Sequence, residues 1–436
     1  MQLFDKCRSQ VRLSKPRLLA ATVLLLLLTV NLGSLALKRF RPVFDIQSHA
    51  VKTASGRSSG VSRRSVRSRV ASSDELLRGD PAPNSPAAGG NTPHSILSKS
   101  MELLSGGKYE DIDGIEAVWQ APPAGTPRRG VVFIAHGCNH GAIDFWPRSS
   151  SCPKCIGLPE EMNVTLHCLL RGYAVVAVSS AAREGSRCWQ SPFGGGGGDP
   201  WDYNQGSAPV DWMRVRRVLD VLLPREQLSP SSSPSLALPL FAVGASSGGA
   251  FVLGLPLVMP GAWAGLAVQI MGGPPGLLRR YRSLNQSAPW PPTMFVHMPR
   301  DQNLAQLVEA NLEELGEGGV RTHEIRVRPQ PLTPLYLAQR CAPEVDERTS
   351  RAVYDALKSA DYLDARGFLR HNPRSPYPPG GGWRAILRAA GLEGLRLQPD
   401  ASPISEELNL LYAGHELTSE TTTDMLDWLE QQVQQQ

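Results

Sequence analysis

One serine in the middle of the chain has a setting that suits nucleophilic chemistry. In the segment Gly244-Ala-Ser246-Ser-Gly248, an apolar run ends abruptly and a second one soon begins. This G-x-S-x-G pattern is typical of a sharp strand-to-helix turn, where the glycines let the two elements approach and the serine hydroxyl is exposed. The N–H of Ser247 would lie at a helix N-terminus, where it can donate to an oxyanion. A simple Gly/Ser turn is the alternative, and a register centred on Ser247 fits less well because Ser246 has glycine at both flanking positions.

Such a serine also needs a histidine that accepts its proton and a carboxylate that orients the histidine. Asp301 follows a strand-like apolar segment as Pro-Arg-Asp, and His415 follows the apolar segment 408–414 just before the last amphipathic helix. The order serine, acid, histidine is the one expected for a nucleophile of this kind. Asp301 could instead only cap the helix that begins near Asn303. The prediction is a covalent acyl-enzyme mechanism with Ser246 as nucleophile, His415 as base and Asp301 as its acid partner.

The loop at 136–140, His-Gly-Cys-Asn-His, is the predicted source of a second oxyanion donor. It follows a continuous apolar segment, 129–135, and its glycine lets the backbone come close to a substrate. The N–H of Cys138 is the preferred donor, with that of Asn139 as the alternative. The same segment could also be no more than a turn.

The elements that must position these residues alternate between strands and helices. Near-continuous apolar segments predict strands at 129–135, 173–179, 236–243, 265–271 and 293–298, partial alternation predicts an early strand at 112–121, and a further strand is expected at 321–328. Helical spacing predicts helices at 158–170, 209–223 and 418–434. Strands of this kind are buried on both faces, so the chain predicts an α/β fold: a mostly parallel sheet with helices on both sides. Ligands of such sheets collect at the carboxyl ends of the strands, where Gly137 and Ser246 are expected.

The interval from Asp301 to His415 is long for this arrangement and predicts an insertion. Beyond the strand at 321–328, the sheet needs neither the helical stretch 334–369 nor the Pro/Gly-rich loop 373–382. We therefore interpret residues 334–405 as a lid or side insertion near the site.

Taken together, these motifs resemble the α/β-hydrolase superfamily and, within it, a poorly characterised plant and algal branch. The resemblance covers about residues 110–434 and is carried by His136 to His140, Cys152 to Glu161, Phe295 to Asp301, and His415-Glu416. It implies the α/β-hydrolase fold and hydrolysis of an ester or related acyl bond by Ser246, Asp301 and His415. The branch implies no particular substrate.

The amino-terminal region predicts a membrane tether. Residues 18–37 form an uncharged apolar run long enough to span a bilayer, after a basic cytosolic tail at 1–17. A cleaved signal peptide is the alternative. Residues 38–95, rich in Arg, Ser, Gly and Pro, predict a disordered stem before the hydrolase domain at 100–436. The expected location is the endomembrane lumen (ER or Golgi) or the exterior, with a plastid reached by bipartite targeting as the alternative.

The cysteines and two sequons agree with an oxidising compartment. Six of the seven cysteines follow the apolar run, and Cys152 and Cys155 could form a disulfide with each other or with a third cysteine. Zinc binding by this pair with nearby histidines is a weaker alternative, and we expect no metal and no cofactor. Asn163 and Asn285 stand in sequons and could carry glycans.

The function predicted from the sequence is a membrane-tethered serine hydrolase. Its expected partners are a small-molecule or lipid ester and the membrane. Nucleic acid is not expected, because the net charge of +5 accompanies a strongly basic front end. The alternatives are a non-catalytic binding protein or receptor that keeps the same fold, and an acyltransferase.

Overall fold

The computed structural model describes residues 93–193, 211–228, 238–376, 378–398 and 400–435. The predicted tail at 1–17, the span at 18–37 and all but the last three residues of the stem at 38–95 lie outside these ranges. Within the described ranges, no helix is both long enough and apolar enough to cross a bilayer.

The described strands form a single sheet with the order β1-β2-β4-β3-β5-β6-β7-β8. Only β2 runs against the others, since it pairs antiparallel with both β1 and β4 while β3 to β8 pair in parallel. This order and this single reversed strand are those of the α/β-hydrolase fold, so the predicted fold class is confirmed. The strands are β1 (Lys108–Ile112), β2 (Ile115–Gln120), β3 (Gly130–Ala135), β4 (Tyr173–Val178), β5 (Leu240–Ala245), β6 (Gly265–Gln269), β7 (Thr293–His297) and β8 (Thr322–Arg326).

Both faces of the central strands are covered. Every residue of β3, β4, β6 and β7 is buried, whereas β1 and β8 at the two edges are partly exposed. Because both faces of these strands are buried, their sequences are continuous apolar runs rather than alternating patterns. Each fully buried Val, Ile or Phe contributes roughly 1.5–3 kcal/mol relative to an exposed side chain.

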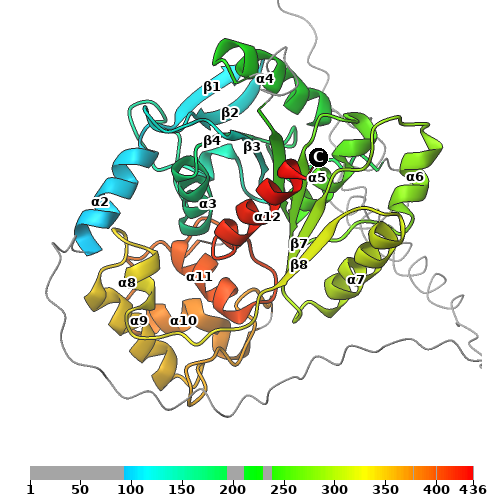
Figure 1. Cartoon of the computed structure of the whole chain (residues 1–436). Coiled ribbons are helices and arrows are strands. Elements are labelled where there is room, and N and C mark those ends of the chain that lie inside the picture. The colour runs from blue at the N-terminus through cyan, green and yellow to red at the C-terminus, as the bar shows by residue number, and fades with distance from the viewer. Residues whose placement is uncertain (1–92, 194–210, 229–237, 377, 399, 436) are drawn as a thin grey trace, which may run out of the picture. The chain divides into compact units, whose positions relative to one another are not determined.

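The helices connect the strands and cover the sheet (Figure 1). α3 and α12 pack against each other, while α5 packs on β3, β5 and β6. The helices are α2 (Pro93–Leu104), α3 (Pro159–Leu170), α4 (Asp211–Arg225), α5 (Ser247–Val258), α6 (Leu277–Ser283), α7 (Gln302–Glu317), α8 (Tyr336–Arg340), α9 (Glu347–Ser359), α10 (Gly382–Ala389), α11 (Pro403–Tyr412) and α12 (Thr422–Gln434), with short 3-10 turns at Ala142–Asp144 and Pro379–Gly381.

Three predicted elements differ from the structure. The single strand expected at 112–121 is the second half of a hairpin, because Asp113 and Gly114 both adopt positive φ (55° and 77°) and form the tight turn between β1 and β2. The helical stretch expected at 334–369 ends at Ser359, after which the chain forms a short antiparallel bridge at Leu363 and Leu369. The last helix begins at Thr422 rather than Thr418.

The region between β8 and α12 has a hydrophobic core of its own. It includes the buried side chains of Leu332, Leu337, Val353, Leu357, Trp383, Leu387, Ile404, Leu408 and Leu411. This core extends beyond the predicted insertion at 334–405 on both sides and incorporates α11. The helix that leads into the His415 loop therefore packs in this core, while its Leu410 packs in the main core.

Candidate active site

Ser246 occupies a strained turn between β5 and α5. Its φ of 53° and ψ of −119° fall in a backbone region that a residue with a side chain rarely adopts. The surrounding structure must hold Ser246 in this conformation. A Cβ on Gly248 would lie 2.3 Å from the carbonyl oxygen of Ala135, and one on Gly244 would lie 2.2 Å from the carbonyl oxygen of Gly248. Glycine is thus required on both sides of Ser246, because the strand and the helix cross with no room for a side chain.

The structure brings the three predicted residues together, although they lie far apart in the chain. His415 Nε2 is 2.9 Å from Ser246 Oγ, and His415 Nδ1 is 3.2 Å from Asp301 Oδ2. The second oxygen of Asp301, Oδ1, accepts the backbone N–H of Leu304 at 3.2 Å and caps α7. The carboxylate of Asp301 therefore makes both contacts at once, one through each oxygen. Its hydrogen bond to His415 holds the pKa of Asp301 below the usual value.

A salt bridge between the exposed Arg374 and the buried Glu416 holds the loop that carries His415. α11 ends in a left-handed residue, Ala413, and the chain turns sharply into His415 and Glu416. The carboxylate of Glu416 accepts hydrogen bonds from Arg374 at 2.6 Å and from Asn409 at 3.0 Å. The Glu416 charge raises the pKa of Arg374. The sequence marks Glu416 only through the His-Glu resemblance and predicts neither of its partners, Arg374 of the insertion and Asn409 of α11.

The predicted oxyanion loop lies directly against the nucleophile. A Cβ on Gly137 would be 3.8 Å from the Cβ of Ser246. The N–H of Asn139 is already used, because it donates to the carbonyl oxygen of Ser186 at 2.5 Å. Among the described residues, no hydrogen bond involves the N–H of Cys138 or that of Ser247. Of the two residues considered for this loop, Cys138 is the one whose N–H remains available.

The two histidines of this loop have opposite environments. Burial lowers the pKa of His136 to about 3, and its Nε2 accepts the N–H of Ser180 at 3.1 Å, so the ring is neutral. Burial alone would also lower the pKa of His140, but the carboxylates of Asp144 at 3.1 Å and Glu161 at 3.7 Å raise it to about 9. His140 is therefore a buried cation at neutral pH, held between two acidic groups.

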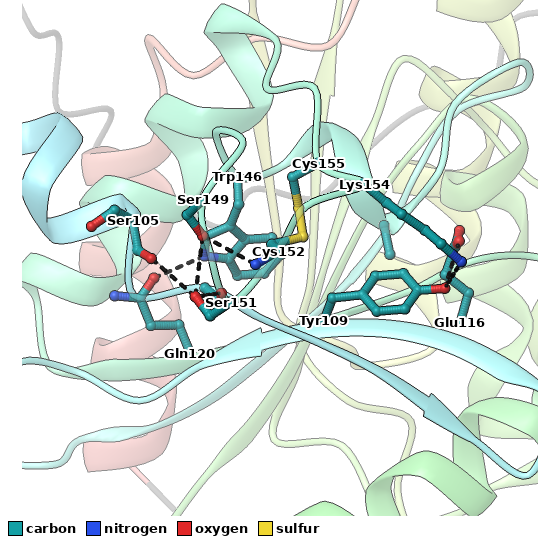
Figure 2. Close-up of a disulfide and its surroundings, with 12 residues drawn as sticks. Ser105, Tyr109, Glu116, Gln120, Trp146, Ser149, Ser151, Cys152, Lys154 and Cys155 are labelled. Atoms are coloured by element: carbon teal, nitrogen blue, oxygen red, sulfur yellow. Dashed lines mark hydrogen bonds between the residues drawn. A yellow bond between two sulfur atoms is a disulfide. The ribbon is translucent and has the colours of Figure 1, made fainter.

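Two disulfides are present among the described residues. Cys152 is joined to Cys155, as the sequence suggested, and both side chains are fully buried. Figure 2 shows this short loop beside Trp146, with Cys152 bonded through its N–H to Ser149. The disulfide between Cys152 and Cys155 leaves the pair without free thiolates for zinc. Cys138 is joined to Cys188, a pairing that sequence analysis did not foresee because 50 residues separate the two.

The two sequons differ in accessibility. Asn163 lies inside α3 and is half-buried, and the hydroxyl-bearing Thr165 of its sequon is fully buried. Asn285 follows α6 in a turn and is exposed. Both remain predictions, with Asn285 the more accessible in the folded chain.

A polar cavity of about 280 Å³ opens beside the His415 and Asp301 side chains. The insertion and α11 together contribute half of its lining residues, and two arginines face it. Its lining residues are Arg300, Asp301, Asn372, Arg374, Asn409, Tyr412, Gly414 and His415.

No protein-family model and no curated protein matches this chain. Solved structures match about half of it. A thermostable esterase is 13% identical, with 53% of this chain and 57% of that esterase covered, at a TM-score of 0.36. A carboxylesterase from Mesorhizobium loti is 15% identical, with 51% and 90% covered, at a TM-score of 0.33. Esterase PE8 is 16% identical, with 52% and 96% covered, at a TM-score of 0.34.

The match thus spans less than two thirds of the thermostable esterase. Likeness at this level does not bear on activity. The fold assignment rests on the strand order, and the chemistry rests on the distances given above.

Proposed function

We propose that this protein is a serine hydrolase that cleaves carboxylic esters through an acyl-enzyme. The observation that carries the proposal is the chain of contacts from Ser246 through His415 to Asp301, with the serine on a strained strand-to-helix turn. A hydroxyl 2.9 Å from an imidazole nitrogen that is itself bonded to a carboxylate is the arrangement that makes serine nucleophilic.

In the first half of the reaction, Ser246 Oγ attacks the ester carbonyl while His415 Nε2 takes the hydroxyl proton. Asp301 keeps the other ring proton on Nδ1 and stabilises the imidazolium that forms. The N–H groups of Cys138 and Ser247 donate hydrogen bonds to the carbonyl oxygen and stabilise the negative charge that develops on it. His415 then protonates the departing alcohol, which leaves an acyl group on Ser246.

In the second half, water replaces the alcohol. His415 accepts a proton from the water as it attacks the acyl-enzyme, and the same two N–H groups stabilise the second oxyanion. Collapse of this intermediate returns the proton to Ser246 and releases the carboxylic acid. No metal or cofactor takes part in these steps.

We also propose the oxidising lumen as the location, as expected from the sequence. The two disulfides support this location, because structural disulfides persist in secretory compartments and are rare in the cytosol. Protease treatment of sealed microsomes tests the lumenal location. Complete digestion of residues 100–436 in sealed vesicles would rule out a lumenal domain.

The activity is tested by labelling the purified protein with a fluorophosphonate and then measuring turnover of p-nitrophenyl esters of increasing acyl length. We expect one label, on Ser246, and hydrolysis that Ser246→Ala abolishes. A wild-type protein that takes up no label and cleaves no ester would refute the proposal and favour the binding protein. Turnover that appears only when an alcohol acceptor is added would favour the acyltransferase.

A further inference from the structure

The loop that carries Cys138 is short and irregular. It leaves the end of β3 beside Ser246 and turns through Asn139, whose φ of 68° is left-handed. Such a loop has no strand or helix of its own to hold it. Its position depends on what it is tied to.

The partner of Cys138 adjoins a buried aromatic cluster beside the proposed nucleophile. Cys188 is followed directly by Trp189, which is fully buried. The Trp189 ring stacks on Phe251 of α5 at 4.4 Å with an interplanar angle of 27°, and lies 5.2 Å from the ring of His136. Cys188 is thus anchored to the helix that begins at the nucleophile.

The two ends of the loop are held by buried histidines, His136 through the N–H of Ser180 and His140 through Asp144 and Glu161. Between these ends, the hydrogen bonds at Asn139, the residue after Cys138, lie near the surface. The N–H of Asn139 donates to Ser186, the guanidinium of Arg187 donates to the carbonyl of Asn139, and the Asn139 side chain donates to Asp400 at 3.1 Å. Ser186 is exposed and Arg187 is partly exposed. Water competes for bonds of this kind, so each contributes little to fixing the loop.

We propose that the disulfide between Cys138 and Cys188 positions the N–H of Cys138 as an oxyanion donor. The inference rests on the proposed function and assigns Cys188 a positioning role in it. Donors in such a site must lie within about 2.7–3.1 Å of the developing charge. A displacement of about 1 Å can cost roughly 100-fold in rate. The disulfide joins the loop to the buried Trp189 anchor through a bond that water cannot disrupt.

The test is the double substitution Cys138→Ser and Cys188→Ser, which removes the covalent tie and keeps both backbone N–H groups. Active sites are counted by fluorophosphonate incorporation after prolonged incubation, and kcat and KM are measured per counted site with a p-nitrophenyl ester. We expect kcat per site to fall by roughly 10- to 100-fold, because the oxyanion is made only in the transition state. KM should change little for the same reason.

The other disulfide supplies the matched control. Cys152→Ser with Cys155→Ser also removes one disulfide, whose two cysteines are buried beside Trp146 and away from the proposed nucleophile. This variant should keep the wild-type kcat per site, even where its Tm falls. A purely structural role for both disulfides would reduce the number of labelled sites in both variants and leave kcat per site unchanged. That result would overturn the inference.

Reduction of the wild-type protein decides the matter if the double variant does not fold. Dithiothreitol gives two electrons and two protons to a disulfide, which becomes two thiols while the reagent closes to its cyclic disulfide. The partly exposed Cys138–Cys188 bond should open before the buried Cys152–Cys155 bond. Alkylation and mass spectrometry identify the open pair, and kcat per site should fall in step with Cys138 alkylation. Full kcat with Cys138 and Cys188 alkylated would overturn the inference.

The proposed function and this inference fail in different ways. An inactive and unlabelled wild-type protein would overturn both. An active wild-type protein whose Cys138 and Cys188 variant has normal kcat per site would overturn only the positioning role.

Discussion

Replacing Asp301 by asparagine should uncouple the two tasks that its carboxylate performs. In the wild-type protein Oδ1 caps α7 through the N–H of Leu304, while Oδ2 faces His415 Nδ1. Asparagine has only one oxygen for these two places. If the oxygen keeps the cap, the amide NH₂ faces Nδ1 and donates to it, which moves the ring proton to Nε2. His415 then cannot accept the proton of Ser246.

The loss of activity can be worked out from the free-energy cost of the other orientation of the asparagine amide. Turning the amide oxygen toward His415 loses the cap, about 1 kcal/mol, and leaves the N–H of Leu304 facing a donor, about 1–3 kcal/mol. Loss of the carboxylate charge beside the imidazolium adds about 1 kcal/mol, a small figure because both side chains are about one-third exposed. The sum of about 3–5 kcal/mol corresponds to a loss of roughly 10²- to 10⁴-fold in kcat/KM.

The assay is p-nitrophenyl ester hydrolysis per fluorophosphonate-titrated site, with thermal unfolding measured in parallel. Asp346 provides the matched control, because its Oδ1 caps α9 through the N–H of Thr349 at 2.7 Å in the same manner. Asp346→Asn should leave kcat/KM unchanged. If Asp301→Asn lowers kcat/KM by less than about tenfold, the Asp301 carboxylate does not hold the ring proton of His415 on Nδ1.

Three further predictions follow from the same geometry. Ser246→Ala should end labelling and lower kcat by on the order of a million-fold. Ser247→Ala should keep the labelling, because its N–H is the proposed donor and its hydroxyl only accepts the N–H of Trp189 at 3.4 Å; the reverse result would move the nucleophile by one residue. Gly248→Ala should destabilise the fold by about 1–3 kcal/mol in urea unfolding, because its Cβ would overlap a backbone carbonyl at 2.3 Å. His140 has a folded-state pKa raised to about 9, so its stabilisation is complete below pH ~6.5 and lost as pH rises through 9. Urea unfolding of His140→Gln should lack that decline, and an unchanged pH profile would contradict the assignment.

Much of the fold could be predicted from the sequence because its central strands are buried on both faces. Continuous apolar runs such as 130–135 and 173–178 have no other common explanation in a chain that alternates them with helical segments. The turn at Ser246 could be predicted because glycine is required two residues before it and two residues after it. The β1–β2 hairpin was missed even though Asp113-Gly114 is a strong turn signal. Partial alternation over the longer segment 112–121 predicts a single strand instead.

The parts of the site that the sequence did not reveal are pairings between distant segments. Neither the bond from Cys138 to Cys188 nor the one from Arg374 to Glu416 has a local spacing that marks it, because each depends on how two loops meet in space. Predicting them would require knowledge of the insertion fold and of the loop that precedes Trp189.

The insertion also has a different relation to the site from the one expected. A lid would cover a site that is complete without it, but here α11, whose end leads to His415, is packed in the insertion core through Ile404, Leu408 and Leu411. Arg374, from the same region, bonds to the residue that follows His415. The position of the base therefore depends on the folding of the insertion as much as on the sheet. The proposed nucleophile, Ser246, lies between β5 and α5 in the main core, and that core also includes Leu410, Ala413 and Leu417 around His415. The segment that carries the proposed base therefore packs in both cores, and it meets Ser246 at the 2.9 Å contact between Ser246 and His415.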